Sequence, residues 1–286
     1  MSQPGRGVAY EREAAQVYDR RSLTYSNTFP DPWKRHAIRA VEWITAKPEI
    51  LRRVRVFERR GAPKGQAFWS AALEVMGVEL LTPPEQVARI PRSGPVVLVA
   101  NHPHGLVDGM VLAELVGRVR PDYRILTRAI LTGIDPSASG FMIPVPFPHE
   151  PNAQARMMAM RAQAMAQLAS GGLLALFPSG VVASARTPFG PPVEAEWNLF
   201  TAKLIRLSGA TVLPVRFPGA NSRAYQIAAC LSPTLRQGLL LREIVHAMDR
   251  PQAPVVGEPI RPEEMEPRWN DPRAFMAWLR ERTLAL

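Results

Sequence analysis

Short apolar runs alternate with helix-like segments along most of this chain, and this alternation restricts the fold more than any other feature. Residues 95–100 have the length and β-branched content of a buried strand. The same pattern predicts further strands at 123–127, 141–145, 173–177, 211–217 and 255–257, and helices at about 108–118, 153–170 and 194–208. Strands and helices that alternate in this way build a sheet with helices on its faces. We therefore expect an α/β fold whose mostly parallel or mixed sheet is flanked by helices, with an N-terminal helical extension.

The N-terminal part of the chain is basic and helical in character. Between residues 33 and 60, nine Lys and Arg residues stand against three Glu residues, with apolar residues interleaved at helical spacing. Pro48 interrupts the pattern, which predicts two short basic amphipathic helices. Prolines between 83 and 95 indicate a linker. We expect a basic helical region at 1–90, in possible contact with a membrane surface, and an α/β domain at 91–286.

The segment that follows the first predicted strand carries the most chemical information. Residues 101–108 are Asn-His-Pro-His-Gly-Leu-Val-Asp, so His102 and Asp108 lie just past a strand's carboxyl end, where open α/β sheets bind ligands. A His that is held and charge-stabilised by an Asp is a competent general base for a hydroxyl group. Two other interpretations stay open: His102 caps the next helix or satisfies a buried carbonyl, or His104 and Asp108 share a helical face and bind a metal.

Three segments, in this order, resemble the motifs of the glycerolipid acyltransferase superfamily (PlsC-like), in particular its hemolysin-like branch. Residues 101–108 resemble the first motif, with five residues between His and Asp where the commoner form has four. Residues 171–180 end in Phe-Pro-Ser-Gly and resemble the block that ends in Phe-Pro-Glu-Gly. Val-Leu-Pro-Val at 212–215 resembles the last block, and Asn-Ser-Arg at 221–223 resembles the hemolysin-like branch. Together the resemblance covers roughly residues 93–245.

The resemblance implies an O-acyltransferase that moves a fatty acyl group from acyl-coenzyme A or acyl carrier protein to a hydroxyl of a lysolipid, without a cofactor or a metal. It makes His102 the general base and Asp108 the group that orients its ring, with His104 as the alternative base or a substrate contact. Four residues of a turn would line the site and offer backbone N–H groups to the oxyanion: Phe177, Pro178, Ser179 and Gly180. A lipid hydrolase that uses the same pair on water, and a non-catalytic membrane-binding relative, are the alternatives.

The sequence departs from the family where arginines are thought to hold the acceptor's phosphate. Ser179 and Val182 stand in place of the expected Glu and Arg of one block, and the block at 140–147 ends in prolines instead of an Arg. A planar guanidinium suits phosphate, so its absence argues against glycerol phosphate as acceptor. Other arginines either substitute or are ordinary surface charges: Arg128, Arg186, Arg216 and Arg223.

The composition is that expected of an enzyme at a membrane surface. Of 286 residues 47% are hydrophobic, yet no run of eighteen apolar residues and no signal-peptide pattern occurs. A single cysteine fits a reducing compartment. The net charge of +10 requires an anionic partner, and a membrane is favoured over nucleic acid because no nucleic-acid-reading module is recognisable. We expect a cytoplasmic protein, peripheral on the inner face of the cytoplasmic membrane; alternatively, the basic helices only pack on the core.

Overall fold

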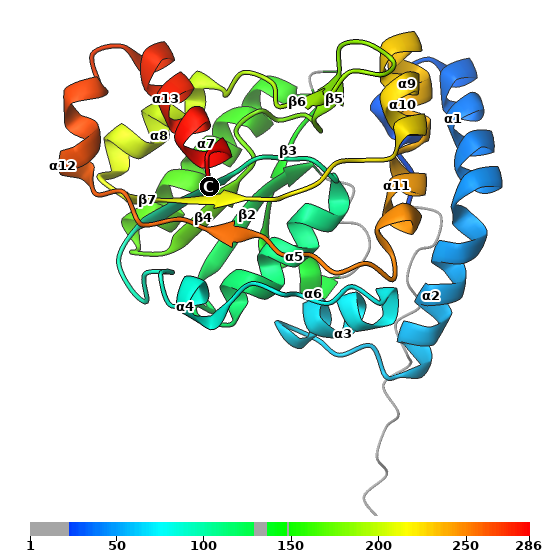
Figure 1. Cartoon of the computed structure of the whole chain (residues 1–286), viewed down its shortest axis with the longest axis horizontal. Helices are drawn as coiled ribbons and strands as arrows, with labels where there is room; N and C mark the ends of the chain where they lie inside the picture. Colours follow the sequence, from blue (N-terminus) through cyan, green and yellow to red (C-terminus); the bar gives the residue numbers. More distant parts are fainter. Residues whose placement is uncertain (1–22, 129–135, 148) are drawn as a thin grey trace, which may run out of the picture.

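A six-stranded mixed sheet forms the centre of the molecule (Figure 1) in the computed structural model, which describes residues 23–128, 136–147 and 149–286. The strands are β1 (Val96–Ala100), β2 (Tyr123–Arg128), β3 (Met142–Val145), β4 (Leu173–Leu176), β7 (Thr211–Arg216) and β8 (Val255–Val256). They lie in the order β3-β2-β4-β1-β7-β8, and only the pair β7–β8 is antiparallel. The expected α/β fold with a mixed sheet is confirmed.

Strand β1 has a neighbour on each side along its length. Val97, for example, pairs with Leu174 of β4 and with Val212 of β7. All five residues of β1 are buried, because successive side chains point to opposite faces and both faces are covered by helices. This burial explains why β1 appears in the sequence as an uninterrupted apolar run.

The helices divide between the two faces of the sheet. The even-numbered residues of β1 pack in an apolar cluster with α2 (Lys47–Arg59), α3 (Ala67–Met76), α5 (Leu106–Gly117) and α11 (Leu240–Ala247). The odd-numbered residues Val97 and Val99 pack in a second cluster with α7 (Ala153–Ala169), α8 (Leu199–Ser208) and α13 (Pro272–Leu284). The sheet therefore has a buried apolar layer on each side.

Three helices lie together at one end of the molecule, beside α2. They are α1 (Pro32–Thr45), α9 (Arg223–Leu231) and α10 (Pro233–Gly238), and α10 packs against both α1 and α9. A two-stranded hairpin of β5 (Ser184–Ala185) and β6 (Pro192–Val193) packs on α9. Helix α13 and the short helix α12 (Pro262–Met265) lie at the opposite end (Figure 1). The remaining short α-helices are α4 (Pro84–Val87) and α6 (Pro136–Ser139), and two 3-10 helices span Ser26–Thr28 and Glu266–Arg268.

The two expected basic helices are present as α1 and α2, which meet at Ala46. A helix expected from residue 194 begins instead at Leu199, because Asn198 caps it by accepting a hydrogen bond from the N–H of Phe200 at 2.8 Å. No helix in the described ranges is both long enough and apolar enough to cross a bilayer.

Candidate active site

Asp108 lies between two histidine rings at the carboxyl end of β1. Its Oδ2 is 3.0 Å from Nδ1 of His102, and its Oδ1 is 2.9 Å from Nδ1 of His104. An ionised carboxylate can only accept hydrogen bonds, so both Nδ1 atoms carry protons. In a neutral His102 the lone pair therefore resides on Nε2, the nitrogen that can take a proton from a hydroxyl group.

The loop before α5 is shaped to hold this carboxylate. Asp108 is fully buried near the start of the helix, and its Oδ2 also accepts hydrogen bonds from the backbone N–H groups of His104 at 2.8 Å and Gly105 at 3.1 Å. Gly105 has φ +78°, a conformation that favours glycine. Burial alone would raise the pKa of Asp108, but hydrogen bonds from the two histidines more than offset it, and the pKa lies below its ordinary value.

His102 faces the turn that the sequence predicted as part of the site. Its ring stacks on Phe177 with 4.0 Å between ring centroids, and its side chain keeps 17% of its surface exposed. The backbone is held on both sides, since its N–H donates to Oε2 of Glu194 at 3.1 Å and its carbonyl accepts from the N–H of Ala183 at 2.8 Å. Residues 183 and 194 flank the β5–β6 hairpin, so both ends of that hairpin are attached to His102.

His104 is buried on the other side of Asp108. A Cβ atom placed on Gly219 would lie 3.1 Å from Nε2 of His104, so the ring packs directly against the main chain of this glycine. The buried carboxylate of Glu243, held by the N–H and hydroxyl of Ser222 at 2.6 and 2.7 Å, acts on His104 electrostatically. Burial lowers the pKa of His104. The hydrogen bond to Asp108 and the negative charges of Asp108 and Glu243 together raise it by more than burial lowers it, so the pKa lies above its ordinary value.

Asn101 fixes the chain immediately before His102. Its side-chain Nδ2 donates to the carbonyl of Phe217 at 2.9 Å, and its Oδ1 accepts from the N–H of Phe217 at 2.7 Å. These two hydrogen bonds connect the carboxyl ends of β1 and β7, as backbone hydrogen bonds do within the sheet. The position of the His102 backbone is thereby set from the strand, from the hairpin and from β7.

The predicted turn lies beside His102, as expected, but not all of its polar groups are free. The N–H of Gly180 donates to the carbonyl of Phe177 at 2.9 Å, and the Ser179 hydroxyl donates to the carbonyl of Val181 at 3.0 Å. Pro178 has no N–H. The N–H groups of Phe177 and Ser179 therefore remain as the turn's candidate donors to an oxyanion, and Ser179 serves the turn and not nucleophilic attack.

The arginines considered as phosphate ligands occupy different places. Arg128 ends β2, where its guanidinium lies 4.8 Å from the centre of the Phe147 ring, and Arg216 ends β7, next to β1. Both lie at the same edge of the sheet as His102, because these strands run parallel. Arg186 lies exposed in the β5–β6 hairpin, and Arg223 donates to the carbonyl of Gly190 at 2.9 Å. Arg128 and Arg216 thus end strands at the edge that carries His102, whereas Arg186 and Arg223 belong to the hairpin attached to His102 and to the helix that packs on it.

The metal interpretation receives no support from the geometry around His104. Its Nδ1 is occupied by the hydrogen bond to Asp108, and Nε2 packs on Gly219. Within residues 23–128, 136–147 and 149–286, no three or more His, Cys, Asp and Glu side chains group in a way that could hold a metal ion.

Three site residues were not predicted from the sequence: Asn101 as a bridge, Glu194 and Glu243. Asn101 lies inside the recognised segment, but its partner is 116 residues away. Glu194 and Glu243 lie outside the recognised motifs, and their charged sequence neighbours, Glu196 and Arg242, do not point to His102 or His104. No local pattern could have identified them.

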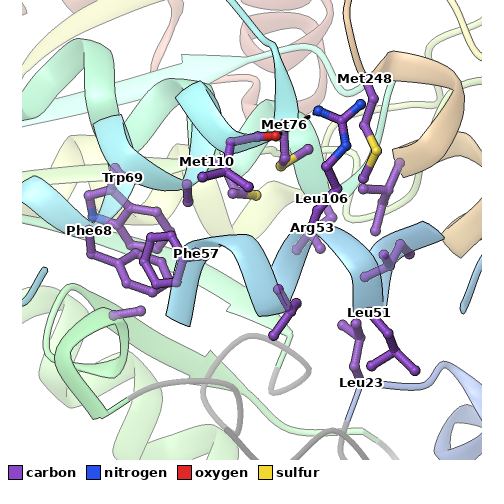
Figure 2. A pocket seen from close by; sticks show the side chains of 16 residues that line it. Leu23, Leu51, Arg53, Phe57, Phe68, Trp69, Met76, Leu106, Met110 and Met248 are labelled. Carbon is purple, nitrogen blue, oxygen red and sulfur yellow. Dashed lines mark hydrogen bonds between the residues drawn. The ribbon is translucent and has the colours of Figure 1, made fainter. Parts of the chain in front are cut away.

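An apolar cavity of about 130 Å³ lies between α2, α3, α5 and α11 (Figure 2). Phe57, Phe68 and Trp69 form one end of it, away from Leu51 and Met248. Two of its lining residues, Leu106 and Met110, come from α5 on either side of Asp108 in the sequence. The charge of Arg53, which also lines the cavity, is balanced by Glu49 and Asp249.

Comparisons with known proteins bear on this site. Residues 84–217 match the protein-family model described as Acyltransferase, a segment that contains His102, Asp108 and the turn at Phe177. The comparison with curated proteins found no significant match. Among solved structures, the fold is similar to that of the 1-acyl-sn-glycerophosphate (LPA) acyltransferase PlsC from Thermotoga maritima, with a TM-score of 0.50 and 14% sequence identity, covering 91% of this chain and 83% of that chain.

Proposed function

We propose that this protein is a PlsC-like O-acyltransferase of lipid synthesis that transfers a fatty acyl group from an acyl thioester to a hydroxyl of a lysolipid, a function supported by the match of residues 84–217 to the Acyltransferase family model. The observation that carries the proposal is the pair His102–Asp108, 3.0 Å apart, with Asp108 fully buried and His102 partly exposed at the carboxyl edge of the sheet. This arrangement suits a general base that works on a hydroxyl group at neutral pH.

In the proposed mechanism, Nε2 of His102 removes the proton from the acceptor's hydroxyl as its oxygen attacks the thioester carbonyl. Asp108 stabilises the imidazolium that forms, because its carboxylate holds the Nδ1 proton. The N–H groups of the Phe177 turn stabilise the tetrahedral oxyanion. The C–S bond then breaks, the thiolate leaves, and the imidazolium returns its proton to the sulfur. No covalent acyl-enzyme is required.

The apolar cavity supports an acyl substrate. A fatty chain needs a space lined by apolar groups, and this cavity is lined by apolar side chains and shares helix α5 with Asp108 through Leu106 and Met110. We expect Met110→Phe to shift the preference of the enzyme toward shorter acyl thioesters. Its rates on a series of thioesters of increasing chain length, compared with those of the wild type, measure the shift.

The acceptor is proposed to be a lysophospholipid or a lyso amino-acid lipid. Val182, which stands where the family has an Arg, lies over the turn at Gly105, since a Cβ there would be 3.4 Å from its Cγ2. This apolar contact replaces a charge-assisted contact to phosphate worth about 1.5–3 kcal/mol, or about tenfold to a hundredfold in preference. Arg128 and Arg216 are the candidate replacements at this edge.

The test is a competition assay in which equimolar acceptors share one acyl thioester and mass spectrometry identifies the products. A lysolipid with its hydroxyl far from a terminal phosphate should be acylated faster than lysophosphatidic acid, and much faster than glycerol 3-phosphate. Coenzyme A and acyl-carrier-protein thioesters are supplied in parallel to identify the donor. Preference for glycerol 3-phosphate would refute the acceptor argument, and fatty-acid release without any acceptor would indicate a hydrolase.

A lysolipid acceptor is presented by a membrane, so the proposed function includes peripheral attachment to the inner face of the cytoplasmic membrane. The net charge of +10 supports attraction to anionic lipid.

A further inference from the structure

One end of the molecule combines exposed apolar side chains with unopposed positive charge. We call it the docking face and define it as α1, the segment 223–238 that contains α9 and α10, and the hairpin 184–193. These segments make up less than a sixth of the chain but hold six of the eleven large apolar side chains exposed in the described residues: Trp33, Trp43, Ile44, Phe189, Leu231 and Leu235.

The exposed residues of α1 form a stripe that faces away from the protein. Trp33 and Ile44 are each 80% exposed, and they lie three turns apart on the side of the helix opposite the buried Ile38 and Glu42. A helix that packs on a core normally presents polar residues to water. The outward stripe of α1 therefore needs a partner that accepts apolar and aromatic side chains.

The charge on the docking face has one sign. Its six cations are Lys34, Arg35, Arg39, Arg186, Arg223 and Arg236. Its only acid is Glu42, which is buried beneath Thr24 and Tyr25. Asp31, just before α1, caps the helix by accepting from the N–H of Trp33. Among the described residues, none of the six cations forms an ion pair with an acid.

Helix α2 differs from the docking face. Arg52 and Arg53, two of the nine cations between residues 33 and 60, are paired with Glu49, and Arg53 is also paired with Asp249 at 2.6 Å. These two charges are therefore neutralised within the protein. Arg55 and Arg59 of α2 form no ion pair among the described residues either, but α2 has no exposed large apolar side chain beside them.

The docking face is attached directly to the candidate base. The hairpin begins beyond Ala183 and ends before Glu194, both bonded to the His102 backbone, and its tip carries Phe189, 83% exposed. Arg223 links α9 to the hairpin through the carbonyl of Gly190. A partner surface that binds the hairpin tip at Phe189 therefore lies close to His102, the candidate base for the lipid hydroxyl.

We propose that the docking face binds an anionic lipid bilayer, with Phe189 and the α1 stripe at the interface between headgroups and acyl chains. Aromatic residues flanked by cations favour this interface. A second copy of the chain fits less well, because a symmetric dimer through this face would bring like charges together. The inference deepens the proposed function by naming the surface through which the lysolipid reaches His102.

The test is sedimentation of the full-length protein with phosphatidylcholine vesicles that contain phosphatidylglycerol, in the absence of acyl donor and acceptor. The variant Trp33→Ser, Lys34→Glu, Phe189→Ser should bind at least about tenfold more weakly than the wild type. The matched control Leu199→Ser, Leu207→Ser, Arg273→Glu changes the same number of exposed apolar side chains and the same charge near the opposite end. It should stay within about threefold of the wild type, because charges beyond a Debye length are screened.

Equal losses in the variant and its control would overturn the proposal, since they would mean that net charge alone attracts the protein. Wild-type binding by the docking variant, or a dimer held by this face in sedimentation velocity without vesicle binding, would also overturn it. If the triple variant is misfolded by circular dichroism, Phe189→Ser alone should still weaken binding several-fold. Vesicle binding without substrates is independent of acyl transfer: an inactive enzyme that binds normally refutes the proposed function and not the docking face.

Discussion

His102 and His104 share one carboxylate but lie in different surroundings. Each donates its Nδ1 proton to Asp108 at about the same distance, 3.0 and 2.9 Å. His102 stacks on an aromatic ring and keeps an exposed edge, whereas His104 packs on the Gly219 main chain near the buried Glu243. Hydrogen bonding alone therefore cannot assign the base. In the proposed function the more exposed ring, His102, meets the substrate, since its side chain is 17% exposed against 10% for His104, and His104 positions Asp108.

The largest expected effect separates the two histidines by activity. His102→Ala removes the proton acceptor, so kcat/KM for acyl transfer should fall by roughly 100-fold to 10,000-fold while the circular dichroism spectrum is unchanged. The parallel variant His104→Ala should lose much less. An inactive His104→Ala together with an active His102→Ala would reverse the assignment and make His104 the base.

Asp108→Asn tests the carboxylate that the two rings share. The amide oxygen can take the place of Oδ2 and keep three donors, and the amide NH₂ can face His104 if that ring changes tautomer. The variant should fold, but loss of the negative charge should lower kcat/KM about tenfold to a hundredfold. Wild-type kcat/KM in a folded variant would show that His102 works without this charge.

His104→Ala should affect stability more than chemistry. It removes the ring that donates to Oδ1 of a fully buried carboxylate, which should lower the free energy of unfolding by about 1–3 kcal/mol. Chemical denaturation of the variant and of His102→Ala measures the difference. If His102→Ala is the less stable of the two variants, His102 and not His104 is the ring that positions Asp108.

The smallest effect is the pH dependence of stability that His104 contributes. Its pKa is raised in the folded protein, so its charge stabilises the fold fully below the unfolded pKa of about 6.5, and this contribution is lost as pH rises through the folded pKa. His104→Asn keeps a donor for Asp108 but does not titrate. The stability difference between wild type and His104→Asn should be larger at pH 6 than at pH 9; a constant difference would mean that His104 is neutral throughout.

The sequence predicted the features whose cause is local. The strand β1 and the helices α1 and α2 follow from hydrophobic pattern and from Pro48, and the resemblance of residues 101–108 to a family motif paired His102 with Asp108. Contacts over long separations were not predictable. Glu194 reaches His102 from 92 residues away, and nothing near Glu194 in the sequence indicates that partner.

The two apolar faces of α1 show a second limit to what the sequence could predict. Ile38 and Ile44 are the same residue type on one amphipathic helix, but Ile38 is 1% exposed and Ile44 is 80% exposed. The pattern showed that the helix is amphipathic. Which apolar side chains become buried depends on where α10 and α11 pack, and these helices come almost 200 residues later in the chain.

The central position of β1 also determines how the enzyme should lose activity on heating. Peptide groups of β1 are bonded to β4 on one side and β7 on the other, so their amide hydrogens exchange with solvent only when the whole sheet opens. His102, the candidate base, lies two residues after this strand, so fraying of the strands at the edges of the sheet does not move it. Thermal inactivation should therefore coincide with global unfolding, with no earlier stage in which the protein remains folded but its catalytic geometry is already lost.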